Sequence, residues 1–128
     1  MPTIIRKTKN LLLEAKRETY KPLIWQVRSD AWRPPTDVYE TDGDLVVRVD
    51  IAGIQDDNVE VTIQGNNLFI NGVRNDISER RAYHQMEIPF GRFSVDIELP
   101  ADVSTKKATV KCQDGFMIIN LPKKKLVK

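Results

Sequence analysis

Apolar and polar residues alternate in six separate runs between residues 45 and 121. Successive side chains of a β-strand point to opposite faces, so each run predicts a strand with one apolar face. The apolar positions are Leu45, Val47, Val49 and Ile51; Val59, Val61 and Ile63; Leu68 and Ile70; Phe93, Val95, Ile97 and Leu99; Ala108, Val110 and Cys112; and Met117, Ile119 and Leu121. Short strands at this spacing predict an all-β fold, an antiparallel sandwich of two packed sheets.

Turn-forming residues separate these runs. Asp42-Gly43 and Asp114-Gly115 are strong hairpin signals, because glycine reaches positive φ without steric cost. Gly65-Asn66-Asn67 is a third candidate turn. Pro100 and Pro122 are expected to close two strands, since proline cannot donate a hydrogen bond to a ladder.

The first 32 residues follow a different pattern. Asn10 is a candidate N-cap for a short helix from Leu11 to about Tyr20, although its apolar residues form a poor stripe. A marginal segment of this kind orders mainly when something else packs on it. Arg33-Pro34-Pro35 then marks a boundary, because proline disfavours helix at the residue before it. We therefore divide the chain into a partly helical N-terminal arm (1–32), a sandwich (33–122) and a C-terminal tail (123–128).

The formal net charge of +2 conceals an asymmetry between these three parts. The arm carries seven Lys/Arg against three Asp/Glu, the sandwich nine against fifteen, and the tail four lysines and no acid. Basic ends of this kind suit nucleic acid or anionic lipid. No aromatic-interleaved RNA motif accompanies them, so we interpret them as solubilising flanks, without specific nucleic-acid binding.

Few residues offer catalytic or metal-binding chemistry. His84 is the only histidine, and a hydrolytic site with Cys112 or a serine is conceivable. Cys112 alternates with a core face, however, where a thiol is usually inert. Clustered metal ligands and a phosphate-binding glycine loop are both missing from the sequence. We expect neither an enzyme nor a cofactor or metal site.

The sequence also contains a few indications of where in the cell the protein is located. The apolar runs fall short of the ~20 residues that a membrane-spanning helix needs, and the N-terminus has no secretory pattern. Cys112 is the only cysteine, which rules out an internal disulfide and fits a reducing compartment. We expect a cytoplasmic protein without a membrane span.

Five segments, in order, resemble the α-crystallin domain of small heat-shock proteins of the bacterial type. Residues 32–41 (WRPPTDVYET) resemble the entry to that domain, and residues 45–53 resemble its next strand with the exit glycine. Asn67–Arg74 is similar to the family's L-x-I-x-G-x-R segment. Gly91-Arg92-Phe93 with Leu99-Pro100 resembles its G-x-F…L-P strand. The closing signature is matched by Ala108, Asp114-Gly115 and Leu121-Pro122-Lys123.

This resemblance implies an immunoglobulin-like sandwich that dimerises and acts as an ATP-independent holding chaperone for unfolding client proteins. In bacterial-type members a strand from the loop after the G-x-R segment crosses to the partner sheet; here that region is residues 75–83, and residues 83–90 that follow it resemble the bacterial type. Val95 stands where the family usually has an arginine, so an interface ion pair made by that arginine is either absent or supplied by another residue, such as Arg92, Arg80 or Arg81. The candidate dimer-interface residues are Arg80, Arg81, Tyr83, His84 and Arg92.

The tail departs from the family by lacking the usual isoleucine-x-isoleucine anchor. That anchor normally docks in a groove of a neighbouring subunit, which the resemblance places between Val59–Gln64 and Thr109–Asp114. Leu126-Val127 is a poor substitute. Dimers, or larger homo-oligomers assembled through the arm, are therefore expected in place of large tail-linked cages. The Leu of the closing signature is Met117, a mild change of similar volume.

Client binding requires apolar surface that becomes exposed under stress. The arm supplies the first candidates: Ile4, Ile5, Leu11, Leu12, Leu13, Leu23, Ile24 and Trp25. The groove residues come second: Val59, Val61, Ile63, Val110 and Cys112. The plainer alternatives are that the arm packs on its own sandwich and that the groove residues are ordinary core. A different function remains open as well, namely an adaptor or co-chaperone like the CS-domain proteins, with one defined protein partner.

Overall fold

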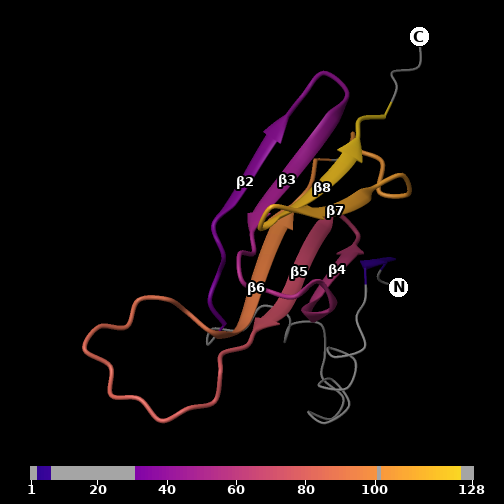
Figure 1. Ribbon diagram of the computed structural model, residues 1–128. Coiled ribbons are helices and arrows are strands. Elements are labelled where there is room, and N and C mark those ends of the chain that lie inside the picture. The colour runs from indigo at the N-terminus through magenta and orange to yellow at the C-terminus, as the bar shows by residue number, and fades with distance from the viewer. Residues whose placement is uncertain (1–2, 7–30, 101, 125–128) are drawn as a thin grey trace.

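The computed structural model describes residues 31–100 and 102–124, together with residues 3–6 by their main chain alone. Over these residues the chain forms two four-stranded sheets with exclusively antiparallel pairing between strands (Figure 1). The first sheet has the order β1 (Thr3–Arg6), β4 (Val59–Gln64), β5 (Asn67–Arg74) and β6 (Gly91–Glu98). The second has the order β2 (Thr36–Glu40), β3 (Asp44–Asp50), β8 (Phe116–Pro122) and β7 (Thr109–Gln113). The predicted all-β sandwich is confirmed.

The core lies between the sheets and consists largely of the apolar faces that alternation predicts. Phe93, Leu68 and Met117 are among its largest fully buried side chains. Ile54 and Val103 join the core from the connections between strands. Four predicted core positions are only partly buried and pack against its rim: Ile97, Ala108, Val110 and Cys112. Burial of these apolar faces supplies most of the stabilisation of the fold.

Three residues are buried although alternation puts them on the faces directed away from the core. Val46 lies opposite Tyr39 in the β2–β3 ladder and is 4% exposed. Thr62 and Phe69 lie opposite each other in the β4–β5 ladder and are 3% and 7% exposed. Alternation therefore identifies the face on which a side chain lies, but it does not determine whether that face is covered.

The predicted turns all occur, although one of them has a different mechanism. Asp114 and Gly115 both have positive φ, at 55° and 85°, and Gly65 has φ 62°. Gly43 does not use positive φ. Between β2 and β3 the Thr41 main-chain N–H donates to the Asp44 carbonyl over 2.9 Å, while the Asp44 N–H donates to the Thr41 hydroxyl over 3.1 Å. The threonine side chain thus takes the role that the sequence pattern assigned to the glycine.

Trp32 fastens the beginning of the sandwich to β6. Its main-chain N–H donates to the Arg92 carbonyl over 3.1 Å, and its carbonyl accepts from the Ser94 N–H over 3.0 Å. Its ring lies 5.5 Å from the ring of Phe93, centroid to centroid. Pro34, two residues later, is fully buried. These contacts tie the residues on both sides of Arg33 to the sandwich, and the domain boundary at Arg33-Pro34-Pro35 stays a prediction.

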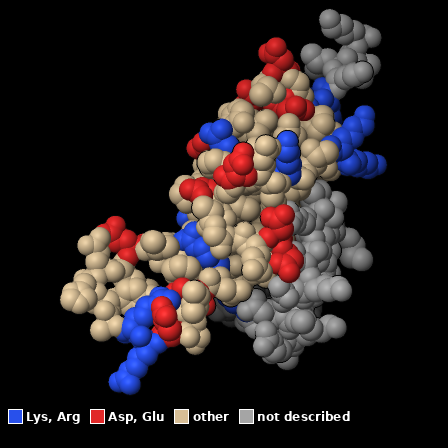
Figure 2. Space-filling model, viewed as in Figure 1, with Lys and Arg blue, Asp and Glu red and all other residues tan. Residues whose placement is uncertain are grey.

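The terminal segments are described only in part. The helix predicted from Leu11 to about Tyr20 lies outside the described residues, whereas Thr3–Arg6, for which no strand was predicted, forms β1. At the other end the Lys123 N–H donates to the Gly43 carbonyl over 2.8 Å. Its ammonium group pairs with Glu40 at 2.8 Å, and this bond raises the pKa of Lys123. Figure 2 shows acidic and basic side chains interspersed over the visible face of the sandwich.

Candidate functional site

The two lateral flanks of the sandwich differ in what covers them. We call one the β4–β7 flank, where β1 pairs with β4 and also approaches β7 of the other sheet. We call the other the β2–β6 flank, where β6 and β2 are the outer strands of the two sheets. Sheet edges expose unpaired N–H and C=O groups and are natural sites for association. Both flanks are therefore candidates for binding other chains.

A long excursion leaves the sandwich beside the β2–β6 flank. Residues 75–90, here called the 75–90 loop, connect β5 to β6 without regular secondary structure and extend well away from both sheets (Figure 1). Every residue in the loop is exposed. Its large apolar side chains include Ile77, Met86 and Ile88, which are 74%, 64% and 62% exposed. A loop that exposes this much apolar surface has the character of an interface.

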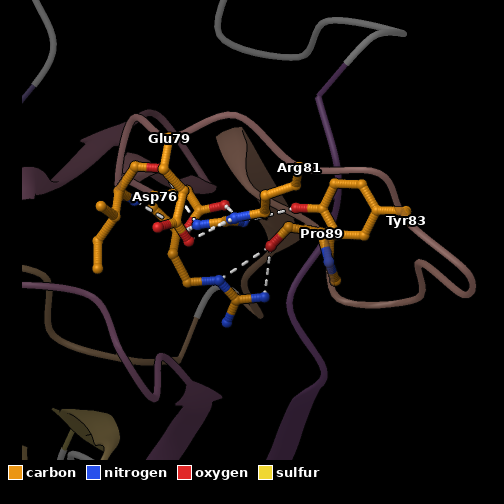
Figure 3. A network of polar contacts seen from close by, with 7 residues as sticks. Asp76, Glu79, Arg81, Tyr83 and Pro89 are labelled. Atoms are coloured by element: carbon orange, nitrogen blue, oxygen red, sulfur yellow. Dashed lines mark hydrogen bonds and ion pairs between the residues drawn. The ribbon is translucent and has the colours of Figure 1, made fainter.

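Arg81 holds the first half of the loop in a defined shape (Figure 3). Its guanidinium group pairs with Asp76 at 2.7 Å and with Glu79 at 2.8 Å, and it donates to the Tyr83 hydroxyl over 2.7 Å. The hydrogen bond from Arg81 lowers the pKa of Asp76, and the bonds to these same acceptors raise the pKa of Arg81. Exposed ion pairs stabilise a fold little. We interpret the cluster as shaping the loop and contributing little to global stability.

Arg74 fastens the far end of the loop to the sandwich. Its Nε and one terminal nitrogen donate to the Pro89 carbonyl over 2.9 and 2.6 Å, and its other terminal nitrogen donates to the Ala52 carbonyl over 3.1 Å. The guanidinium carbon also lies 4.3 Å from the centre of the Trp32 ring and 5.3 Å from that of Phe90. The planar guanidinium group of Arg74 donates to two carbonyls and lies against two aromatic rings. A lysine ammonium group cannot reproduce this geometry.

Strand β2, which forms the β2–β6 flank together with β6, is largely exposed. β2 is the outer strand of its sheet, and four of its five residues are exposed. Val38, which lies opposite the buried core residue Val47, is itself 48% exposed. Within the described residues no strand pairs with the outer edge of β2. The β2 edge is therefore an available acceptor for a strand.

The structure brings most of the predicted interface residues together. Arg80, Arg81, Tyr83 and His84 all lie on the exposed 75–90 loop. Arg92 lies apart from them on β6, where it is half-buried opposite Val73. Their assignment to a dimer interface remains a prediction. No functional role was predicted for Arg74, although two signals pointed to it: it is the arginine of the L-x-I-x-G-x-R segment, and it lies immediately before the loop.

The β4–β7 flank contains the other predicted residues. Val59, Val61 and Ile63 are fully buried members of the core, while Val110 and Cys112 are half-buried at its rim on β7. Ile4 and Ile5 belong to β1. The remaining predicted client-binding residues lie outside the described residues: Leu11, Leu12, Leu13, Leu23, Ile24 and Trp25.

The described part of the chain contains neither a cluster of metal-ligand residues nor a membrane-spanning helix. Among residues 3–6, 31–100 and 102–124, no three His, Cys, Asp or Glu residues gather where they could hold a metal ion. The same residues contain no helix that is long and apolar enough to cross a membrane.

Comparison with known proteins identifies the family. Residues 37–128 match the sequence profile of the Hsp20/alpha crystallin family. The chain belongs to the Hsp20/alpha crystallin family. Among its relatives, small heat shock protein C4 of Rickettsia felis is 33% identical over 71% of this chain and 57% of that protein. A 17.9 kDa class II heat shock protein of Helianthus annuus is 34% identical over 70% of this chain and 58% of that protein.

Solved structures agree with this family assignment. A small heat-shock protein from Xylella fastidiosa, described as having a distinct high order structure, superposes with a TM-score of 0.69 at 25% identity, covering 76% of this chain and 91% of that one. A variant of hsp14.1 from Sulfolobus superposes with a TM-score of 0.63 at 27% identity, covering 91% and 98%. This Hsp20-family chain spans 57% to 60% of the length of its Rickettsia relatives. Its Rickettsia relatives are named small heat shock proteins.

Proposed function

We propose that this chain is an ATP-independent holding chaperone that binds partly unfolded proteins through apolar surface and so prevents their aggregation. The observation that carries the proposal is the match of residues 37–128, most of the chain, to the Hsp20/alpha crystallin family. The apolar clusters of the arm and the exposed apolar loop supply surface of the kind that such binding needs. The solitary Cys112 supports placing the protein in a reducing compartment, the cytoplasm.

We assign client binding first to the arm. Leu11, Leu12 and Leu13 form one apolar cluster, and Leu23, Ile24 and Trp25 form another. Apolar association is non-directional, so these clusters suit partners that share no sequence. The interspersed charges of the sandwich would keep a complex with a client in solution.

The functional unit that we propose is a homodimer joined through the β2–β6 flank. Each 75–90 loop would lay a segment along the β2 edge of its partner. Two observations support this pairing: the loop exposes Ile77, Met86 and Ile88, and β2 exposes Val38 and an open edge. Joining them would cover apolar surface and satisfy main-chain groups at once. Arg74 would fix the point from which the loop departs.

Aggregation assays test the chaperone proposal. Insulin reduced with dithiothreitol and malate dehydrogenase on mild heating are two unrelated aggregating clients. We expect the chain to suppress light scattering from both without nucleotide, and ATP to make no difference. An adaptor with one defined partner would suppress neither. Unchanged scattering of both clients at a molar excess of the chain would overturn the proposal.

Solution mass tests the dimer. We expect the triple variant Ile77→Ser, Met86→Ser, Ile88→Ser to shift the basic unit from dimer to monomer, because it removes the apolar surface that the partner would cover. The mass is measured by light scattering after size-exclusion chromatography. Phe116→Ser is the matched control, since Phe116 is 41% exposed on β8, a strand between β3 and β7. A triple variant with the mass of the wild type would contradict the proposed interface.

A further inference from the structure

The outer face of the first sheet is covered at its centre, although it lies away from the core. We define this face as the side of β4, β5 and β6 on which Thr62 and Phe69 lie opposite each other. Phe69 is 7% exposed, whereas Tyr39 and Phe116, on the outer face of the second sheet, are 39% and 41% exposed. Neighbouring strands lie beside a side chain and leave the top of its ring open, so burial of Phe69 requires a segment that lies over the face.

The described neighbours of β5 do not account for this cover. β4 and β6 lie beside it in the sheet, and the 3-10 turn Asp56–Asn58 approaches Gly72 on the inner face. Two polar atoms of the outer face, Gln64 Oε1 and Asn71 Nδ2, are also buried, and within the part of the chain that the structure describes they have no hydrogen-bond partner. Buried polar atoms are normally paired, so a main-chain segment laid over this face would satisfy both atoms and cover Phe69.

The chain itself must pass from one edge of this sheet to the other between Arg6 and Ala31. β1 lies at one edge, beside β4, and Trp32 bridges to Phe93 on the far side of the opposite edge strand, β6. The inner face is filled by the core, so the connection passes over the outer face or around one end of the sheet. Four strand spacings separate the two points, roughly 19 Å. Residues 7–30 can span several times that distance, so they are long enough to lie along the face.

The charges of this face and of the segment that connects its edges are complementary. The outer face bears Glu60, Asp96 and Glu98 against a single arginine on β4, β5 and β6. Residues 7–30 carry six Lys/Arg against three Asp/Glu, and they include both apolar clusters of the arm. Opposite charge thus favours docking of this segment on the face, and Phe69 offers apolar contact at the centre.

We propose that the outer face of the first sheet is the resting dock of residues 7–30 of the same chain, and that a client binds once the apolar clusters of this segment have left Phe69. This inference rests on the proposed role of the arm in client binding and adds a resting state to it. The same apolar side chains serve the dock and the client, so docking lowers the apparent affinity for clients to the fraction that is undocked. The tether holds the segment near the face at an effective concentration in the millimolar range.

Photo-cross-linking tests where the segment lies. Phe69 is replaced by p-benzoylphenylalanine, an aromatic residue that links to nearby C–H groups under ultraviolet light, and the linked peptides are identified by mass spectrometry. We expect links from this position to residues 7–30. The same replacement at Phe116, on the outer face of the second sheet, is the matched control and is expected to give few such links. In a mixture of isotope-labelled and unlabelled chains, a dock in cis gives links that contain only one isotope.

Two variants of the full chain test the competition with clients. The probe is labelled, reduced and carboxymethylated α-lactalbumin, which stays unfolded, and the readout is fluorescence anisotropy. We expect Phe69→Ser to bind this probe about tenfold more tightly than the wild type, because it removes the apolar contact of the dock. Asp96→Lys with Glu98→Lys reverses two exposed charges of the face and is expected to bind about threefold more tightly. The matched control, Asp42→Lys with Asp102→Lys, makes the same change of charge in two exposed connections and is expected to bind like the wild type.

The outcomes separate this inference from the proposed function. Links to residues 7–30 that are no more frequent from position 69 than from position 116 overturn the dock, and links that join two isotopes overturn docking in cis. Equal probe binding by the wild type and the charge-reversed variant overturns the competition, however Phe69→Ser folds. Suppression of insulin aggregation would survive these results, and the chaperone proposal would stand. Conversely, a chain that gives the expected links but suppresses no aggregation would retain the dock and lose the chaperone function.

Discussion

Replacing Gly72 with alanine is expected to destabilise the sandwich by about 3 kcal/mol, the upper end of the usual overpacking range. A Cβ at this position would lie 2.5 Å from the main-chain oxygen of Asn58 and 2.7 Å from Cε2 of Phe93, and closer still to Cζ of that ring. Side-chain carbons essentially never approach other atoms within 3.0 Å. Phe93 is 1% exposed, and close packing in a protein core opposes movement of such a ring. The ring, or the strand that carries Asn58, must therefore shift.

Gly43→Ala is the matched control for this prediction. A Cβ at Gly43 would meet nothing within 4 Å, and Gly43 does not have positive φ. We expect its effect to lie within about 0.5 kcal/mol, as for ordinary surface changes. Urea titrations followed by tryptophan fluorescence give both free energies of unfolding. Equal stabilities of the two variants would show that the Phe93–Asn58 contact around Gly72 yields easily, contrary to the close packing described above.

Replacing Phe93 with alanine is expected to cost about 3–5 kcal/mol, the usual range for removing a fully buried phenylalanine. The loss combines the transfer energy of the ring with the cavity that it leaves, because its neighbours in two sheets relax only partly. Phe93 also supports the Trp32 ring, on which Arg74 stacks. We therefore expect the variant to loosen the base of the 75–90 loop as well as the core.

Phe116→Ala makes the same chemical change at a position that is 41% exposed. There the ring lies beside the Arg48 guanidinium group on the outer face of the second sheet, 5.8 Å from it. We expect a cost below about 1 kcal/mol, since exposed cation–π contacts contribute about that much. Thermal unfolding of the two variants in parallel measures the difference. A Phe93→Ala variant no less stable than Phe116→Ala would refute the central place given to Phe93.

A continuous series of side-chain contacts thus connects the core to the 75–90 loop, which we propose to form the dimer interface. Phe93 in the core contacts Trp32, and Trp32 carries Arg74, which holds the Pro89 carbonyl at the end of the loop. Changes in the core and changes in assembly are consequently expected to be coupled. Solution mass measured for the Phe93→Ala variant at a temperature where it remains folded would report that coupling directly.

The six strands from β3 to β8, their inward faces and their turns were predictable from local sequence. Alternation over runs such as Leu45–Ile51 is a property of neighbouring residues, and a β-strand translates it directly into two faces. The turns at Gly65 and Asp114-Gly115 follow from positive φ, which is also a local requirement. The family resemblance was carried by the same segments, and the match of residues 37–128 confirms it.

What the tertiary structure decided depends on contacts between residues far apart in the chain. Four residues, Thr3–Arg6, contain too little pattern to predict a strand, and their partner Val61–Ile63 lies more than fifty positions away. Arg74 carries no local sign of its contacts with Ala52, Pro89 and Trp32. Burial of Thr62 and Phe69 on the face opposite the core likewise has no signature in alternation. Non-local pairing is set by which surfaces meet once the sheets have formed, and local periodicity contains no information on that.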